Sequence, residues 1–318
     1  MSAIAQLHDP QQCIGFKHVV IATDFSDASD RALAYALAIA HRYSCALSVV
    51  HAIKPEPREQ IPMEPLPREL NRRRLEAEQQ MKKLGEKAGL NDLEHDLLLE
   101  QGPVWDVLAS VIQREKADLL VLGTRGRGGL KKLALGSVAE EVLNLAPWPV
   151  LTVGPHVRPA DSGMVEFKRI LFATDFGPAS AKALSYVLSL AVDYRAKLVL
   201  LHMMPTMPIA DLGPATYGPS SYAAEKFVAW QRTTRDESVR KLTELVPTNT
   251  NLVAKPECVV GTDFLPEGIL EAAAMHRVDL IVMGANRRSS ARMAAHMPWV
   301  LTHEVICRAK CPVLTVLD

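Results

Sequence analysis

The chain has 318 residues, about twice the length of an ordinary domain, and 48% of them are hydrophobic, which is enough for two sizeable cores. The 36 basic and 36 acidic residues balance, and neither half carries a strong positive excess, so nucleic-acid binding is not expected. The odd number of five cysteines predicts reduced thiols in a soluble, cytoplasmic protein. The N-terminus does not resemble a signal peptide, and apolar runs such as residues 119–122 are too short to cross a membrane.

The first half of the chain is repeated in the second half. Residues 16–53 align without gaps on residues 167–204, at an offset of 151, and 16 of these 38 positions are identical. Both copies also end on the same sequence, Pro-Val-Leu-Thr-Val, at 149–153 and 312–316. Two copies of one domain follow from this repetition. We predict domains at 1–155 and 164–318, joined by a linker that contains Gly and Pro.

The predicted elements alternate between strands and helices along the first copy. Apolar runs predict buried strands, and the spacing of apolar residues predicts helices between them. The strands are expected at 19–22, 47–52, 97–100, 118–122 and 150–153, and the helices at 31–43, 69–88, 104–115 and 137–145. The second copy repeats this order with a longer middle segment, 205–247. Each domain is therefore an α/β fold with an open parallel sheet of about five strands and helices on both faces.

A glycine-rich segment follows the predicted strand at 118–122. Glycines at 123, 126, 128 and 129 allow the backbone to turn tightly and to approach a ligand closely. Gly136 and Ser137 then open a predicted helix, whose first N–H groups favour an anion, and basic residues lie nearby. The pattern indicates a phosphate-binding loop. The alternative is a surface loop that the glycines merely shape, with Ser137 as a helix cap.

Two common phosphate motifs do not fit the chain. The sequence contains no Gly-Lys-Ser/Thr tripeptide, which the Walker motif requires. The dinucleotide motif requires glycines directly after the first strand, where this chain has Thr23-Asp24-Phe25.

With these motifs in place, the chain strongly resembles the universal stress protein family. The family motif Gly-x2-Gly-x9-Gly-Ser/Thr is met by Gly123, Gly126, Gly136 and Ser137. The Ala-Thr-Asp-Phe-Ser segment at 22–26 and the ending of each copy are similar to the family as well. The resemblance covers nearly the whole chain and implies an adenine nucleotide alpha-hydrolase-like fold that binds ATP, ADP or AMP, with Mg²⁺ as an accompanying ion.

The resemblance also implies roles for individual residues. Asp24 is expected to meet the ribose and base, with Ala22 and Thr23 nearby, although Asp24 also suits a turn before a helix. His51 and Ala52 are expected to border the adenine, and the alternative for His51 is a histidine packed at a strand end in both copies. The phosphates are expected to lie among six residues: Gly123, Gly126, Arg127, Gly136, Ser137 and Val138.

The second copy departs from this motif. Asp175 is retained, but Arg287 replaces the second glycine, and Trp299 and Val300 stand where Gly136 and Ser137 are found in the first copy. Bulky side chains at these positions would obstruct a backbone cradle for phosphate. We therefore expect the second copy not to bind ATP in the same manner.

Neither a metal site nor a catalytic set is predicted. His303, Cys307 and Cys311 are spaced four residues apart, as a zinc site on one helix face might require. Cys311 directly precedes a proline, however, where a helix should already have ended, so buried thiols are the favoured interpretation. Ser137 has no evident His/Asp relay in the sequence.

The resemblance points to an ATP-binding protein that acts in the stress response through nucleotide-dependent regulation or partner binding. Two alternatives stay open: a slow ATPase or phosphotransferase that uses the same pocket, and a ligand-free scaffold. Proteins of this family commonly pair through their last strands, so an internal pseudo-dimer of the two copies is expected, and a homodimer of chains is a further option.

Overall fold

A computed structural model describes residues 14–54, 67–87, 89–124, 135–158, 165–204, 221–262, 265–285 and 298–317. Contacts between residues divide the chain into two compact units. The first unit comprises Gly15–Glu166 and Ala285–Asp318, and the second comprises Met1–Ile14 and Phe167–Gly284. The last helix and strand of the second repeat therefore belong to the compact unit built on the first repeat.

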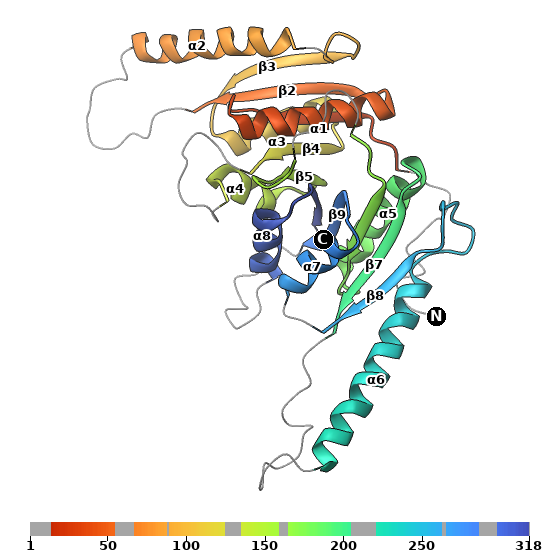
Figure 1. Ribbon diagram of the computed structural model, residues 1–318. Coiled ribbons are helices and arrows are strands. Elements are labelled where there is room, and N and C mark those ends of the chain that lie inside the picture. The colour runs from red at the N-terminus through yellow and green to blue at the C-terminus, as the bar shows by residue number, and fades with distance from the viewer. Residues whose placement is uncertain are drawn as a thin grey trace. The chain divides into compact units, whose positions relative to one another are not determined.

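The first unit contains a sheet whose described strands follow the order β3-β2-β1-β4-β5-β10 (Figure 1). The first five of these strands are parallel, and β10 joins β5 in the antiparallel direction. The strands are β1 (His18–Ala22), β2 (Ala46–Ile53), β3 (His95–Gln101), β4 (Leu119–Gly123), β5 (Val150–Val153) and β10 (Val313–Leu317). Valine, leucine and isoleucine fill β1 and β4 because both faces of these central strands are covered.

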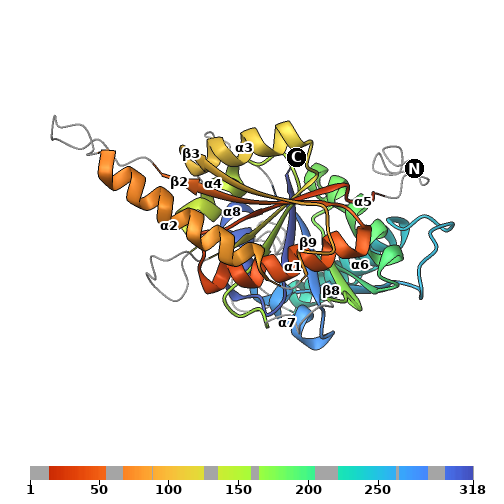
Figure 2. The same ribbon diagram turned by 90° about the horizontal axis from the view of Figure 1, so that it is seen from above.

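Helices cover both faces of this sheet. They are α1 (Asp27–Tyr43), α2 (Pro67–Gly85), α3 (Val104–Glu115), α4 (Ser137–Leu145) and α8 (Pro298–Arg308). Figure 2 shows α1 and α2 on one side of the strands and α3 on the other. Right-handed crossovers require this arrangement, because the chain moves outward from β1 to β3 and then returns across the sheet to β4.

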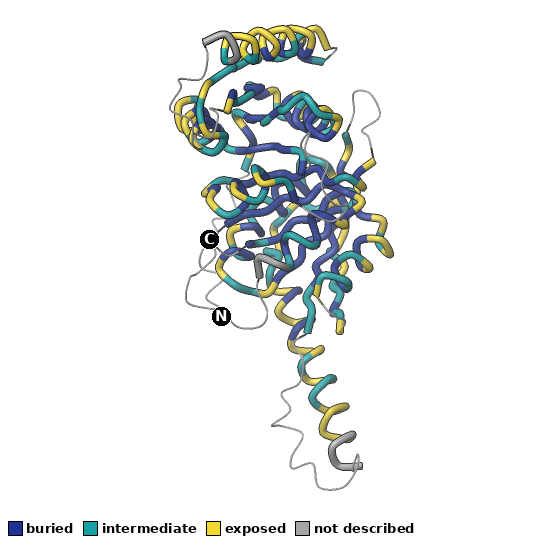
Figure 3. Tube along the Cα trace, turned by 90° about the vertical axis from the view of Figure 1, so that its left-hand side faces the viewer, coloured by how far each residue is buried: buried dark blue, intermediate teal, exposed yellow. Residues whose placement is uncertain are grey.

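The second unit is built in the same way from the second repeat. Its described strands follow the order β9-β6-β7-β8, and all their pairings are parallel. The strands are β6 (Arg169–Ala173), β7 (Lys197–Met203), β8 (Glu257–Gly261) and β9 (Leu280–Ala285). The helices are α5 (Pro178–Asp193), α6 (Ser221–Glu244) and α7 (Glu267–Met275). Figure 3 shows buried central strands and exposed residues along α2 and α6, whereas the edge strands β3 and β8 are mostly half-buried.

The predicted alternation of strands and helices is confirmed, and most boundaries agree within two residues. Helix α1 is an exception, because it begins at Asp27 rather than at Arg31. Its N-cap is Ser26, whose hydroxyl accepts a hydrogen bond from the backbone N–H of Ser29 at 3.3 Å. Among the described residues, no helix combines the length and hydropathy that a membrane span requires.

The last strands of the two repeats pair with each other, as the resemblance implies. The antiparallel register joins Thr152 to Val313, Leu151 to Leu314 and Val150 to Thr315. The strand pair is therefore symmetric about its central leucines, because corresponding residues of the two repeats exchange places across it.

Candidate functional site

The ends of β1, β2 and β4, which carry several of the predicted site residues, lie side by side where the order of the sheet reverses. Ala22 at the end of β1 pairs with Leu122 of β4 on one side and with Val50 of β2 on the other. Helices α1 and α4, which follow β1 and β4, lie on opposite faces of the sheet, since α4 contacts α3 and α3 lies opposite α1 (Figure 2). A crevice beyond the carboxyl ends of the strands at such a switch point is the usual ligand site of open α/β sheets.

The turn after β1 has a specific backbone conformation. Phe25 has a φ of 59°, which is uncommon for a bulky residue, and its N–H donates to the hydroxyl of Thr23 at 3.0 Å. Asp24 Oδ1 accepts hydrogen bonds from the N–H and the hydroxyl of Ser26, at 3.1 and 2.6 Å. The turn role that the sequence offers for Asp24 is therefore present, and it leads directly into the cap of α1.

The second repeat forms the same turn. Phe176 has a φ of 60°, and its N–H donates to the hydroxyl of Thr174 at 2.9 Å. Asp175 Oδ1 accepts from the N–H of Gly177 at 2.8 Å and from the hydroxyl of Ser180 at 2.7 Å. The repetition of Ala-Thr-Asp-Phe thus preserves a turn in both copies, whatever each copy binds.

His51 also has a packing role that both repeats share. Its Nδ1 lies 2.7 Å from the carbonyl oxygen of Thr23, and its ring packs on Phe25 with centroids 4.4 Å apart. A carbonyl can only accept, so Nδ1 carries the proton. His202 makes the same contacts, with Thr174 at 2.9 Å and Phe176 at 4.5 Å. His51 is therefore packed at a strand end in the same way as His202, which is the alternative interpretation of this residue.

Gly123 is required for the packing of β4 against α1, whether or not it also contacts a ligand. A Cβ at this position would lie 2.7 Å from the backbone carbon and oxygen of Ala28, at the start of α1. Gly284 of the second repeat would meet the backbone of Ala179 and Ser180 at 2.5 Å or less. Both repeats keep this glycine because a strand end crosses the first turn of a helix there.

The N-terminus of α4 lies at the end of β4. The N–H of Gly136 donates to the carbonyl of Thr124 at 2.9 Å, and Thr124 in turn donates to Val153 of β5 at 3.2 Å. Gly136 is the N-cap residue and offers no side chain, so Ser137, the first helical residue, is not the cap that the sequence suggested. Val138 follows in the same turn. Gly126 and Arg127 lie outside the described residues.

The corresponding helix of the second repeat starts earlier. Helix α8 begins at Pro298, so Trp299, which aligns with the N-cap Gly136, already lies inside the helix together with Val300. The second repeat therefore has a residue inside the helix where the first repeat has a glycine N-cap. Arg287 lies outside the described residues.

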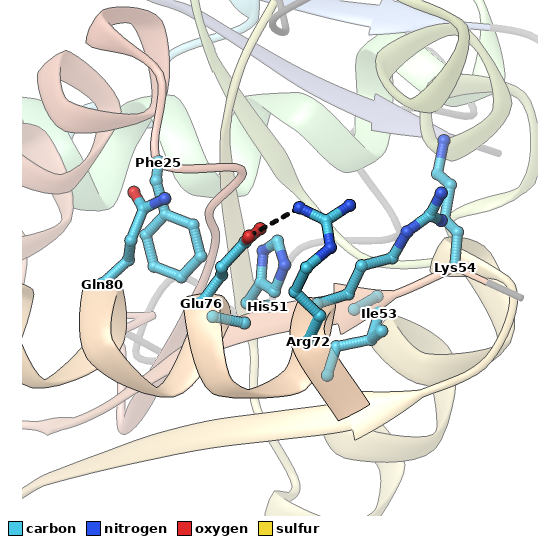
Figure 4. Close-up of a pocket in the computed structure, with 10 residues that line it drawn as sticks. Phe25, His51, Ile53, Lys54, Arg72, Glu76 and Gln80 are labelled. Carbon is cyan, nitrogen blue, oxygen red and sulfur yellow. Dashed lines mark hydrogen bonds and ion pairs between the residues drawn. The ribbon is translucent and has the colours of Figure 1, made fainter. Parts of the chain in front are cut away.

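A pocket of about 280 Å³ opens beside His51 and Ala52 (Figure 4). Phe25 and the end of β2 form one wall, and side chains of α2 form the other. The residues from α2 are Arg72, Arg73, Glu76, Ala77 and Gln80. None of these α2 residues is among the predicted site residues. Adjacent arginines on one helix were the available signal.

Four of the five cysteines lie among the described residues, as does His303, the third member of the zinc alternative. The four described cysteines, Cys45, Cys258, Cys307 and Cys311, form no disulfide. Three of them are buried, Cys258 being the exception. No group of three or more metal-ligating side chains gathers among the residues that the structure describes, which include His303.

Comparison with known proteins identifies the family. The family model described as "Universal stress protein family" matches the chain twice, at residues 15–154 and 166–316. A universal stress protein of Thermus aquaticus is 40% identical over 139 residues, covering 43% of this chain and 98% of the relative. One from Methanocaldococcus jannaschii is 34% identical over 142 residues, covering 43% of this chain and 82% of the relative.

Two solved structures match nearly the whole chain in fold. A universal stress protein from Archaeoglobus fulgidus has a TM-score of 0.63 at 18% identity, covering 94% of this chain and 98% of its own. A Pseudomonas aeruginosa protein of unknown function has a TM-score of 0.58 at 14% identity, covering 95% of this chain and 93% of its own. The two matches of the family model, together with the motifs and the repeated fold, establish that the chain belongs to the universal stress protein family.

Proposed function

We propose that the first repeat binds one adenine nucleotide, ATP, ADP or AMP, and that its occupancy regulates how the protein engages partners during stress. The observation that carries this proposal is the convergence at the sheet's switch point of the β1–α1 turn, the end of β2 and the start of α4. These are the segments that carry the family's nucleotide motif.

The chemistry of these segments suits a nucleotide. The first N–H groups of α4 are preceded by a glycine N-cap, so no side chain of that residue stands between them and an anion. Asp24 is held by Ser26 in a fixed turn directly after β1. His51 and Ala52 offer a ring and a small apolar side chain at the end of β2. We assign the phosphates to α4, the ribose to Asp24, and the base to His51 and Ala52.

One nucleotide per chain is expected, because the corresponding helix of the second repeat starts earlier, at Pro298, and has no glycine N-cap at the position of Gly136. The second repeat retains the turn at Asp175, the histidine His202 and the glycine Gly284. These features alone therefore do not indicate nucleotide binding. The difference between the repeats lies at Gly136 and its counterpart Trp299. The second repeat is proposed to act as a structural partner.

The test is a direct measurement of nucleotide content and affinity. The purified chain is denatured, the released nucleotide is quantified by chromatography, and the stripped protein is titrated with ATP, ADP and AMP. We expect one site. Asp24→Ala should weaken binding about tenfold or more, the effect of losing one charge-assisted hydrogen bond.

Asp175→Ala is the matched control, because it removes the same kind of turn in the second repeat. It should leave the affinity unchanged. Two nucleotides per chain would show that the second repeat also binds, and the absence of binding would leave the chain as a scaffold. Phosphate release is followed in the same samples, and sustained turnover that Asp24→Ala abolishes would make the protein a slow ATPase.

A further inference from the structure

We infer that the second repeat binds a medium-chain carboxylate, in a pocket beside the amino end of β8. The pocket belongs entirely to the second unit, whereas the segments assigned to the nucleotide belong to the first. The inference therefore goes beyond the proposed function and does not depend on it, because it gives the repeat without the glycine N-cap a ligand of its own.

The pocket lies between the end of α6, the start of β8 and the loop 245–256 that joins them. Its volume is about 310 Å³. Leu200 of β7 and Cys258 of β8, which are paired neighbours in the sheet, line it together. The turn at Asp175 follows β6 at the opposite, carboxyl end of these parallel strands. The pocket therefore lies away from the edge at which open α/β sheets usually bind nucleotides.

The lining is mostly apolar and carries few polar groups. Hydroxyl groups come from Thr243, Thr248 and Thr250, and a thiol comes from Cys258. Among the described residues that line the pocket, Lys255 is the only one with a charged side chain. Such a composition is typical of sites for small organic ligands, whose apolar body is enclosed and whose polar end is oriented. The apolar residues are Leu200, Val246, Pro247, Leu252, Ala254 and Pro256.

The loop that forms the outer wall is held by its own backbone. The N–H of Thr250 donates to the carbonyl of Pro247 at 3.0 Å, and the N–H of Leu252 donates to the carbonyl of Thr250 at 2.9 Å. Pro247 and Pro256 each fix a φ angle in this wall. A ligand therefore enters a pocket that is already formed, which lowers the entropy cost of binding.

The thiol of Cys258 is attached to α6 at one side of the pocket. The hydroxyl of Thr243 donates to the carbonyl of Val239 at 2.8 Å, so in the 3.8 Å contact between Thr243 Oγ1 and Cys258 Sγ the thiol is the donor. Cys258 is half-buried and lines the pocket. Its rate of alkylation therefore reports whether the pocket is filled.

The first repeat provides an internal comparison for this region. Cys258 corresponds to Leu97, because each pairs with the equivalent residue of the preceding strand. The same offset of 161 residues matches the buried Met81 of α2 to the buried Leu242 of α6. The two loops between helix and strand therefore have equal length and can be compared residue by residue.

In the first repeat, a strand side chain reaches the end of the helix. A Cβ on Gly85, the last residue of α2, would lie 2.7 Å from Cδ1 of Leu97. In the second repeat, the shorter Cys258 stands in place of this leucine, and Val246, the counterpart of Gly85, lines the pocket. The side chain that extends from the strand across this space is thus missing.

The loops differ in the same direction. Leu90 in the loop of the first repeat is completely buried, whereas its counterpart Asn251 is exposed. None of the residues 245–256, all of which the structure describes, is buried. The second repeat therefore has no loop side chain that fills the space as Leu90 does.

The volume and the charge define the class of ligand. A cavity of about 150 Å³ holds benzene, so a pocket of about 310 Å³ accommodates an apolar chain of roughly eight to ten carbons. A carboxylate at the end of this chain would pair with the ammonium group of Lys255 and accept hydrogen bonds from the threonine hydroxyls. Lys255 is exposed, so the carboxylate stays hydrated and the chain supplies most of the affinity.

The experiment titrates the full chain with decanoate by calorimetry. We expect one site. Hexanoate should bind about tenfold more weakly or worse, because it buries four fewer CH₂ groups. Decyltrimethylammonium, which has the same chain and the opposite charge, should bind several-fold more weakly than decanoate. Equal affinities for these two amphiphiles, or no binding of decanoate, would overturn the inference.

Lys255→Gln should weaken the binding of decanoate about threefold, the effect of losing one exposed ion pair. Lys197→Gln is the matched control, because Lys197 is an exposed lysine at the amino end of β7 that does not line the pocket. It should leave the affinity unchanged. Equal losses from the two variants would show a general charge effect and overturn the assignment of a carboxylate.

Decanoate should also slow the alkylation of Cys258 about fivefold or more, followed by mass spectrometry. The buried Cys45 of the first unit should stay unlabelled in the same samples, which shows that the chain remains folded. Cys258→Leu, which installs the residue of the first repeat, should abolish binding, and Cys258→Ser should retain it. If the leucine variant does not fold, protection of the wild-type thiol decides: unchanged labelling at saturating decanoate overturns the inference.

Discussion

The hydroxyl of Thr152 donates a hydrogen bond to the carbonyl oxygen of Val313, 3.0 Å away, across the pairing of β5 and β10. The corresponding hydroxyl of the second repeat, Thr315, donates to the carbonyl of Val150 at 3.3 Å. Both threonines are buried, and the two bonds are related by the local symmetry of the strand pair. The last strands of the two repeats are therefore joined by side chains as well as by backbone.

Replacing these threonines should weaken the strand pair without changing its shape. Thr152→Val and Thr315→Val are each expected to lower the free energy of unfolding by about 1 kcal/mol, because a buried carbonyl loses a hydrogen bond. Urea denaturation measures the change. The double variant should show roughly the sum of both losses. No loss in either variant would mean that these hydroxyls contribute nothing to the pairing.

Gly123→Ala should destabilise the first unit. The added Cβ would lie 2.7 Å from the backbone of Ala28, which cannot yield as a flexible side chain can. Overpacking of this kind costs about 1–3 kcal/mol, measured by thermal or urea unfolding.

Gly15→Ala is the control, because its Cβ would lie 3.8 Å from the ring of Tyr43, an ordinary contact. It should be nearly neutral. A stable Gly123→Ala variant that had lost nucleotide affinity would show instead that this glycine is needed for the ligand alone.

The pKa of His202 is lowered below its ordinary value of 6.5, first by burial and then by the charge of Lys241, which outweigh the raising effects of Thr174 and Asp175. As the pH falls, the imidazole of His202 is therefore protonated at a higher pH in the unfolded chain than in the folded protein. The contribution of His202 to stability is complete above about pH 6.5 and is lost as the pH falls from there through the folded pKa.

Lys241→Gln should raise the pKa of His202, because it removes a positive charge that lowers it, and should therefore reduce the loss of stability in acid. Titration of the imidazole by NMR measures the shift directly. Asp175→Asn is the control of opposite sign, since it removes a charge that raises the pKa. Shifts in the same direction for both variants would contradict this electrostatic account.

Cys45 should be unreactive in the folded protein. Burial and the charge of Asp118 raise the pKa of its thiol to about 11, so at pH 8 roughly one molecule in a thousand carries the thiolate. Mass spectrometry after alkylation at pH 8 should find Cys45 unmodified until denaturant is added, while the half-buried Cys258 reacts earlier. Rapid native labelling of Cys45 would show that α1 and β2 separate readily.

Much of this architecture can be predicted from the sequence, because the patterns that specify the strands and turns lie within short segments. The apolar runs at 19–22 and 119–122 give buried strands, and the repeat of Ala-Thr-Asp-Phe marks the same turn twice. Parallel strands end at one edge, so the sequence predicts that the segments around Asp24 and Gly123 lie together, and the family resemblance adds His51 to them.

The family resemblance predicted the pairing of the last strands, and the structure adds its register between segments about 160 residues apart. The tertiary structure alone decided two further matters. It shows that a side chain at position 123 would clash with the backbone of α1, a requirement for glycine that the loop motif does not predict. It also turned Arg72 and Arg73 toward the end of β2. Helical periodicity identifies the apolar side of α2, but only the packing of that side on the sheet determines which polar neighbours come to face a pocket.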